Sequence, residues 1–207
     1  LHDALPIFRH ASRSVLMHII NAIKTGDVNE APRLEAMLSH TIQSNKEREM
    51  AYVRQATHDA LTGCKNRRAF DSDIAELLNA QQPFAMALVD IDNFKSINDT
   101  LGHLTGDIVL RNVAREGIQI MQPHHVSVYR YGGEEFAVIF QAEQMSSALS
   151  LLEAWRTAVE KRLWREENLR VTFSGGLGEW HFEPLEQFVG SVDNALYSAK
   201  QQGKNRI

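Results

Sequence analysis

Apolar residues recur along this chain in two different periods, and the period changes near residue 58. In residues 4–24 they stand three or four positions apart, which predicts a helix with one broad apolar stripe. Residues 25–27 contain a glycine that ends this helix. A second helix is predicted from about Asn29 to Thr57, with Pro32 tolerated in its first turn.

The second predicted helix carries a seam of mixed character. Its members stand near heptad spacing and include polar residues: Leu34, Leu38, Ile42, Asn45, Glu49, Tyr52 and Ala56. A lone helical hairpin cannot cover the stripe of the first helix, so residues 1–57 need a partner chain or further helices. They form either a plain packing face of a bundle or a signalling stalk whose polar seam sets register. Because the chain opens on Leu1 rather than methionine, we expect a fragment of a longer protein.

From residue 58 onward the pattern predicts a mixed α/β domain. Runs of apolar, β-branched and aromatic residues predict strands at 84–89, 126–129, 136–140 and 170–175. Helical periodicity predicts helices at 67–80, 94–101, 106–121, 146–163 and 185–202. A tight hairpin in the middle of this order favours a mixed sheet layered with helices over a purely parallel sheet.

Composition narrows the class of protein. A length of 207 residues suits one domain of about 150 residues plus an extra element. The single cysteine, Cys64, excludes an internal disulfide framework and fits a reducing compartment. A net charge of -4 argues against a general nucleic-acid binder. The sequence shows neither an apolar run long enough for a membrane span nor a signal-peptide pattern.

The most informative local pattern is RYGGEEF at residues 130–136. Glycines between two strand-like runs predict a tight hairpin, because glycine reaches positive φ without steric cost. Gly132 and Gly133 also leave the tip without side chains, so a bulky ligand could lie against the backbone. Glu134 and Glu135 beside the tip could hold a metal or accept a proton. The alternative is an ordinary solvated hairpin.

A second candidate pattern, DIDNFK at residues 90–95, begins where the buried strand ends. Carboxylates at that position lie at a sheet rim, where α/β folds place ligands. If the two strands are neighbours, Asp90 and Glu134 can share a divalent cation with a backbone carbonyl. Such oxygen ligands suit Mg²⁺, and two metal ions could bridge the attacking and leaving oxygens of a displacement at phosphorus. The alternative for Asp90 is a helix cap or a turn residue.

Two further patterns concern a nucleotide. An ionised Asp107 can accept two hydrogen bonds from the N1–H and 2-amino group of guanine, a donor pair that adenine lacks, and Asn98 would complete the recognition of the base. The alternative is that Asp107 caps the helix it opens. Lys200 and Lys204 stand four apart, on one face of the last predicted helix. They are either solvated or suited to a triphosphate.

Together these motifs closely resemble the GGDEF family of diguanylate cyclases. The matching blocks are DALTGCKNRR at 59–68, DIDNFKSIND at 90–99, GHLTGD at 102–107, RYGGEEF at 130–136 and AKQQGKNR at 199–206. Five blocks in the same order are far more specific than any one of them. The resemblance implies a catalytic domain at residues 58–207, and we expect residues 1–57 to form a helical segment that dimerises and transmits a signal.

The resemblance implies an α/β (α+β) fold with a palm-like mixed or antiparallel sheet and surrounding helices, as in class III nucleotidyl cyclases. It implies the condensation of two GTP into cyclic di-GMP with loss of two pyrophosphates, with Mg²⁺ as the metal and Mn²⁺ as an alternative. Each subunit would hold one GTP, so a C2 homodimer is expected to bring the two nucleotides together. An upstream sensor in the same chain is expected to control the reaction, in the cytoplasm.

The resemblance also implies roles for single residues. Asp90 and the Ile91 carbonyl would hold the metal together with Glu134, and Glu135 would assist. Glu134 would also accept the proton of the 3′-hydroxyl, and Lys95 would stabilise charge on the triphosphate. The remaining nucleotide contacts would come from the backbone amides of Asn93 and Phe94, from Asn98, His103 and Asp107, from the glycines Gly132 and Gly133, and from Lys200 and Lys204 on phosphates.

One segment departs from the family pattern. Product-inhibited members carry Arg-x-x-Asp shortly before the hairpin, whereas residues 123–126 here read PHHV. We therefore expect no tight product binding at that inhibitory site.

Two alternative functions follow from the same sequence. The domain could be a catalytically silent module that binds GTP or cyclic di-GMP, which would predict a broken hairpin or a missing metal carboxylate. The N-terminal part could instead sense zinc or haem through His2, His10, His18 and His40, although their spacing matches no usual zinc pattern.

Overall fold

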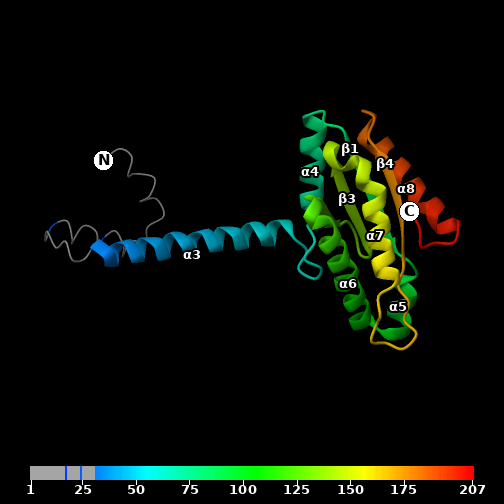
Figure 1. Cartoon of the computed structure of the whole chain (residues 1–207), viewed down its shortest axis with the longest axis horizontal. Coiled ribbons are helices and arrows are strands. Elements are labelled where there is room, and N and C mark those ends of the chain that lie inside the picture. The colour runs from blue at the N-terminus through cyan, green and yellow to red at the C-terminus, as the bar shows by residue number, and fades with distance from the viewer. Residues whose placement is uncertain (1–16, 18–23, 25–30) are drawn as a thin grey trace. The chain divides into compact units, whose positions relative to one another are not determined.

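The structure is a computed structural model that describes residues 17, 24 and 31–207 (Figure 1). The chain divides into two compact units, Leu1–Ala56 and Thr57–Ile207, and each is described by itself. Apart from residues 17 and 24, the predicted first helix at residues 4–24 lies outside the described residues. So do its break at residues 25–27 and three of the four N-terminal histidines.

The N-terminal unit contains one long helix, α3 (Ala31–Thr57), of 27 residues. It confirms the second predicted helix and places Pro32 in the first turn. Large apolar side chains of α3 remain exposed, with Ile42 at 48% and Tyr52 at 72% of their possible surface. His40 is exposed on the same helix. None of the helices in the described part of the chain combines the length and hydropathy that a membrane span requires.

The second unit is built on a four-stranded antiparallel sheet. The strands are β1 (Phe84–Ile91), β2 (Ser127–Arg130), β3 (Glu135–Gln141) and β4 (Phe173–Glu179). Their order in the sheet is β2-β3-β1-β4, so the hairpin strand β3 lies directly beside β1. In this register Asp90 stands opposite Glu135 on one side and Ser174 on the other.

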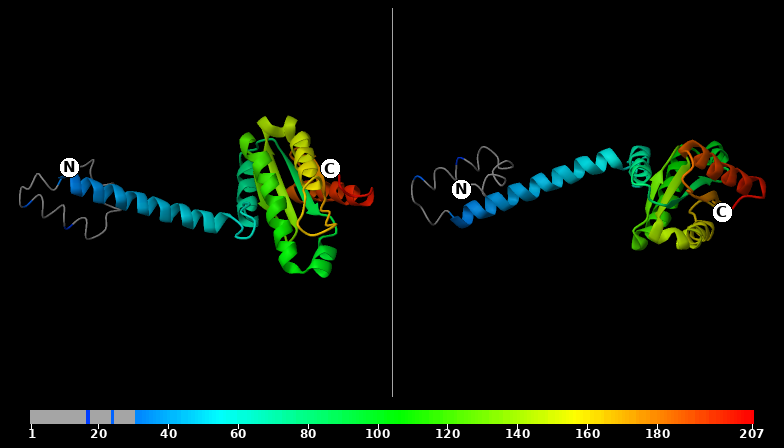
Figure 2. Two further views of the ribbon diagram at one scale, coloured as in Figure 1. Left: turned by 60° about the horizontal axis from the view of Figure 1, so that its bottom comes forward. Right: turned by 90° about the horizontal axis from the view of Figure 1, so that it is seen from above.

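Five α-helices cover the two faces of the sheet. They are α4 (Arg67–Asn79), α5 (Phe94–Leu101), α6 (His103–Met121), α7 (Ala148–Glu160) and α8 (Leu185–Gln201). Short 3₁₀ helices, η2 (Gln122–His124) and η3 (Ala142–Ser147), follow α6 and precede α7. Figure 2 shows the sheet between two helical layers, which confirms the predicted mixed α/β class.

The strand period of two distributes β1 between two cores. Ala87 and Val89 belong to the core under α5, α6 and α7, whereas Met86 and Leu88 belong to the core under α4 and α8. Because β1 is buried on both faces, it has the continuous apolar run that the sequence shows. Trp155 anchors the first core and donates its indole N–H to the Val113 carbonyl at 2.9 Å.

Two predicted boundaries were wrong in ways that affect the site. Helix α6 begins at His103 rather than residue 106, because Gly102 at φ 83 ends α5 and starts α6 in a single residue. Strand β4 lies at 173–179 rather than 170–175. Its Gly176 contacts the backbone of α8 so closely that an added Cβ would overlap the Val192 carbonyl.

Candidate active site

The end of β1 and the beginning of β3 bring three carboxylates together. Asp90 pairs with Glu135 in the ladder, and the Ile91 N–H approaches the Glu134 carbonyl at 3.4 Å. The pKa of Glu135 is raised above its usual value by partial burial and by the negative charges of Asp90 and Glu134. The predicted neighbour relation between these two strands is therefore confirmed, and it concentrates negative charge at one sheet rim.

This donor set fits a divalent cation that keeps part of its water shell. In the described part of the chain, no three His, Cys, Asp or Glu side chains form a ready-made metal cage. Two carboxylates and a backbone carbonyl leave coordination positions for water and phosphate oxygens, as Mg²⁺ prefers. Partial burial and the charges of Asp90 and Glu134 raise the pKa of Glu135, and a bound cation would favour its ionised form.

Lys200 and Lys204 both reach the end of β1, by different routes. Lys200 lies in the last turn of α8 and forms an ion pair with Asp90 at 2.9 Å. Lys204 lies beyond α8 and donates a hydrogen bond to the Asn93 side-chain oxygen at 2.6 Å. The prediction that the two lysines share a helical face was wrong, because α8 ends at Gln201 and Gly203 turns the chain at φ 112.

The first turn of α5 lies next to the carboxylates. Asn93 adopts a left-handed conformation, at φ 55, as the residue before α5, and its side chain makes no capping bond to the helix. Phe94 is buried in the core, whereas Lys95 is exposed and has no hydrogen-bond or ion-pair partner among the residues that the structure describes. The free backbone amides at a helix start and an unpaired lysine provide a positive environment beside the carboxylate cluster.

Asn98 lies where α5 packs on α6, against the residue that precedes Asp107. A Cβ added to that residue, Gly106, would overlap the Asn98 side-chain oxygen. Asp107 does not cap its helix, because α6 begins at His103 and its preceding residue is Gly102. The capping interpretation of Asp107 was therefore wrong, which leaves its carboxylate available for a ligand. His103 is exposed at the start of the same helix.

The predicted positive φ was wrong for both hairpin glycines, whereas the predicted open tip agrees with the free space at Gly133. Positive φ angles occur among the described glycines at Gly63, Gly102 and Gly203, not at Gly132 or Gly133. A Cβ at Gly132 would instead overlap the Glu135 carboxylate, whereas a Cβ at Gly133 would meet nothing within 4 Å. The first glycine makes room for a carboxylate, and the second faces open space.

Arg130 links the hairpin tip to Asp59 through hydrogen bonds and an ion pair. Its Nη2 and Nε donate to the Gly133 carbonyl at 2.9 and 3.2 Å, and its Nη1 forms an ion pair with Asp59 at 3.1 Å. Burial opposes the charge of Asp59, but hydrogen bonds from Thr62 and the Arg130 guanidinium lower the pKa of this carboxyl overall. Sequence reasoning gave neither residue a role, although both lie within matching motif blocks.

Asp92 was also missed. This carboxylate is only 5% exposed and accepts hydrogen bonds from Ser174 and Thr172 at 2.7 Å and from the Asn205 N–H at 3.1 Å. It ties the end of β1 to the start of β4 and to the C-terminal segment. Within one Asp-x-Asp pair, Asp90 faces the carboxylate cluster and Asp92 holds the fold around it.

The chain belongs to the GGDEF family, since the family described as "Diguanylate cyclase, GGDEF domain" matches residues 56–206. Curated relatives include diguanylate cyclase VdcA of Vibrio cholerae, 37% identical over 168 residues. Another is DgcZ of Escherichia coli, 33% identical over 177 residues. These alignments cover 78% and 83% of this chain but only 49% and 60% of the relatives. The chain thus spans about half the length of the curated relatives it matches.

Solved structures show the same architecture. The coiled coil and GGDEF domain of DgcB from Caulobacter crescentus, in complex with c-di-GMP, is 33% identical with a TM-score of 0.70. That comparison covers 86% of this chain and 97% of the chain in that structure. The active GGEEF domain of a diguanylate cyclase from Vibrio cholerae is 32% identical with a TM-score of 0.62, covering 69% of this chain and 94% of that domain.

Proposed function

We propose that this protein is a diguanylate cyclase that condenses two GTP into cyclic di-GMP and two pyrophosphates. The observation that carries the proposal is the meeting of Asp90, Glu134 and Glu135 at the β1–β3 rim, with Lys200 bound to Asp90. The family and the curated diguanylate cyclases similar to this chain support the same activity.

In the proposed reaction each 3′-hydroxyl oxygen attacks the α-phosphorus of the other GTP. The new P–O bond forms as the bond to the bridging oxygen breaks, and pyrophosphate leaves. Glu134 accepts the hydroxyl proton. Mg²⁺, or Mn²⁺ in its place, bound by Asp90, the Ile91 carbonyl, Glu134 and Glu135, would supply positive charge at the phosphate oxygens.

The remaining residues would bind and orient the nucleotide. Asn98 lies against Gly106, the residue before Asp107, and Asn98 and Asp107 would select guanine through its N1–H and 2-amino group, with His103 at the same helix start. The open space at Gly133 would leave room for the nucleotide against the hairpin. Lys95, Lys200, Lys204 and the amides of Asn93 and Phe94 would contact the triphosphate. Catalysis of this kind rests on positioning and electrostatic stabilisation.

One subunit supplies only half of the reacting pair, so we propose a C2 homodimer with the active centre at the boundary. The exposed apolar residues of α3 support pairing with a second copy, and DgcB was solved with its coiled coil. Residues 1–57 would then dimerise and carry a signal from an upstream sensor to residues 58–207, within the cytoplasm.

The proposal is tested by incubating the chain with GTP and Mg²⁺ and separating the nucleotide products. We expect cyclic di-GMP and pyrophosphate from the parent, and a loss of about 100-fold or more in rate for Glu134→Gln, because the proton acceptor is removed. Glu143→Gln, an exposed carboxylate on η3, is the matched control and should retain the parental rate. Binding of GTP without any cyclic dinucleotide would instead establish the silent binding module.

A further inference from the structure

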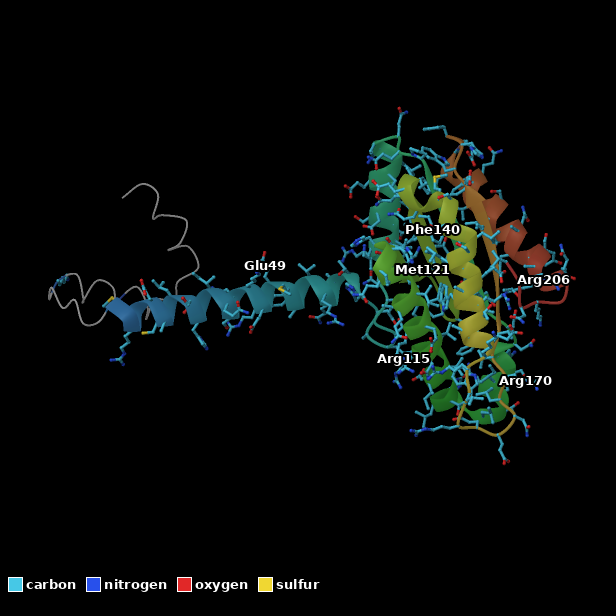
Figure 3. All side chains as sticks on the ribbon, viewed as in Figure 1. Glu49, Arg115, Met121, Phe140, Arg170 and Arg206 are labelled. Carbon is cyan, nitrogen blue, oxygen red and sulfur yellow. The ribbon has the colours of Figure 1, made fainter. Side chains whose placement is uncertain are left out.

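A hollow lies on the outer side of α6, and it shares no residue with the candidate active site. It has a volume of about 420 Å³ and is lined by Ile108, Asn112 and Arg115 of α6 and by residues 162–166 after α7. Arg115 is labelled on α6 in Figure 3. A second hollow of about 380 Å³ shares the three α6 residues and adds Arg111. This is the size of a site for one small organic ligand.

The lining of these hollows is rich in arginine although the chain as a whole carries a net charge of -4. Arg162 is held in place by Glu116 at 2.5 Å and Asn112 at 2.7 Å. The side chains of Arg111 and Arg165 are exposed and form no hydrogen bond or ion pair with any residue that the structure describes. Planar guanidinium groups without acceptors favour a ligand that carries phosphate or carbonyl oxygens.

An aromatic ring lies in the same wall. The Trp164 ring stands 5.4 Å from the Arg162 guanidinium carbon. The indole Nε1 of Trp164 and the Nε of Arg162 are both buried, and neither has a hydrogen-bond partner in the structure. Buried donors without acceptors are uncommon in folded proteins. Together they favour a flat ligand that stacks on the indole and supplies acceptor atoms.

Glu166 decides between classes of ligand. Glu166 lines the same hollow, and its negative charge would repel an anion that has acceptors alone. It can accept hydrogen bonds from the adjacent N1–H and 2-amino group of guanine, while an arginine donates to guanine O6 and N7. A concave hollow with a carboxylate in its wall also suits a small molecule better than a flat anionic surface. We propose that this hollow is a second guanine-nucleotide site, with Trp164 and Glu166 on the base and Arg165 on phosphate.

The test uses the full chain with Asp107→Ala, which removes the proposed guanine contact of the active site and so isolates the hollow. GDP, cyclic di-GMP and ADP are titrated separately while tryptophan fluorescence and heat of binding are recorded. We expect GDP or cyclic di-GMP, or both, to bind and quench the fluorescence, and ADP to bind about tenfold more weakly or not at all. Neither guanine ligand needs to react, so an inactive enzyme leaves this test intact.

Second substitutions in the same background locate the binding. Arg165→Ala and Glu166→Ala should each weaken guanine-nucleotide binding about tenfold or more, and Trp164→Phe should remove the quenching. Arg170→Ala, at another exposed arginine that lines neither hollow, is the matched control and should leave the affinity unchanged. The proposal is overturned if Asp107→Ala alone abolishes all guanine-nucleotide binding, if Arg165→Ala binds like the control, or if ADP binds as well as GDP.

Discussion

The pKa of Glu135 reflects the negative charge and the burial at the carboxylate cluster. Its carboxyl is partly buried beside Asp90 and Glu134, and both effects raise its pKa above the usual value of 4.5. The folded protein therefore binds this proton more tightly than the unfolded chain does. The associated stability is fully present below the unfolded pKa and is lost as the pH rises through the folded value.

We expect Glu135→Gln to raise the free energy of unfolding at pH 7 in metal-free buffer, because it removes that loss. The advantage should shrink as the pH falls toward 4.5 and below, where the parental carboxyl is also protonated. Urea unfolding of both proteins at pH 7 and pH 4 measures it. Millimolar Mg²⁺ should stabilise the parent more than the variant. A variant that is less stable at pH 7 without metal would contradict the charge argument.

At the scale of single residues, the sequence identified candidate site residues that lie within local motifs. It did not identify residues whose role depends on partners far away in the sequence. Asp90 and Glu134 could be linked from the sequence because each lies in a motif that resembles the GGDEF family, on the condition that their strands are neighbours. Asp92 could not be assigned, because its partners Ser174 and Thr172 lie about eighty positions away. Nothing local in an Asp-x-Asp pair says which carboxylate faces a ligand and which is buried.

The hairpin between β2 and β3 is the element whose geometry the site depends on most. Its tip is held by hydrogen bonds from Arg130 to the Gly133 carbonyl, and Arg130 is itself fixed by Asp59. Arg67 stacks on the neighbouring Tyr131 ring at 3.7 Å. The position of Glu134 is thus set by contacts at the base of the hairpin.

We expect Arg130→Lys to loosen the hairpin tip, since one ammonium cannot reproduce the two-sided contacts of the guanidinium fork. Amide hydrogen exchange at residues 132–134 should be faster, and cyclic di-GMP formation should fall about tenfold through misplacement of Glu134. Arg68→Lys, an exposed arginine on α4, should change neither quantity. Unchanged exchange in Arg130→Lys would show that the tip is held by other contacts.

At the scale of elements, the sequence predicted which helices and strands exist better than where they begin. Strand β1 was predicted from its apolar run, which reflects burial on both faces of the sheet. The start of α4 was also predicted, and Asn66, the residue before the helix, is a typical capping residue. The start of β4 was placed too early, because residues 170–172 are strand-like by composition. The glycines of β4 are explained only by close contact with α8, which is a tertiary constraint.

At the scale of the whole molecule, α3 stands out because most of its described side chains are exposed. Its seam residues Ile42 and Tyr52 are largely exposed, although apolar side chains at heptad spacing usually pack against a partner helix. Pairing of two chains through this seam would place two GTP-binding domains in one particle, as the proposed reaction requires.

We expect Ile42→Asp to weaken dimerisation about tenfold or more, because it places a charge in the proposed helical seam. Sedimentation over a range of protein concentrations measures the change, and removal of residues 1–57 should also weaken the dimer. His40→Asp, on the exposed side of the helix away from the seam, is the matched control. An unchanged dimer in Ile42→Asp would assign dimerisation to another surface.

The burial of Asp92 also bears on how variants of this chain should be interpreted in a genetic screen. A substitution at Asp92 would strand three donors, from Ser174, Thr172 and Asn205, and would reduce the yield of folded protein. We expect a substitution at Asp90 to leave a folded protein that fails in the proposed reaction. Loss-of-function variants at these two positions should therefore respond differently to temperature. Growth of the cells at lower temperature should restore activity to the Asp92 variant only.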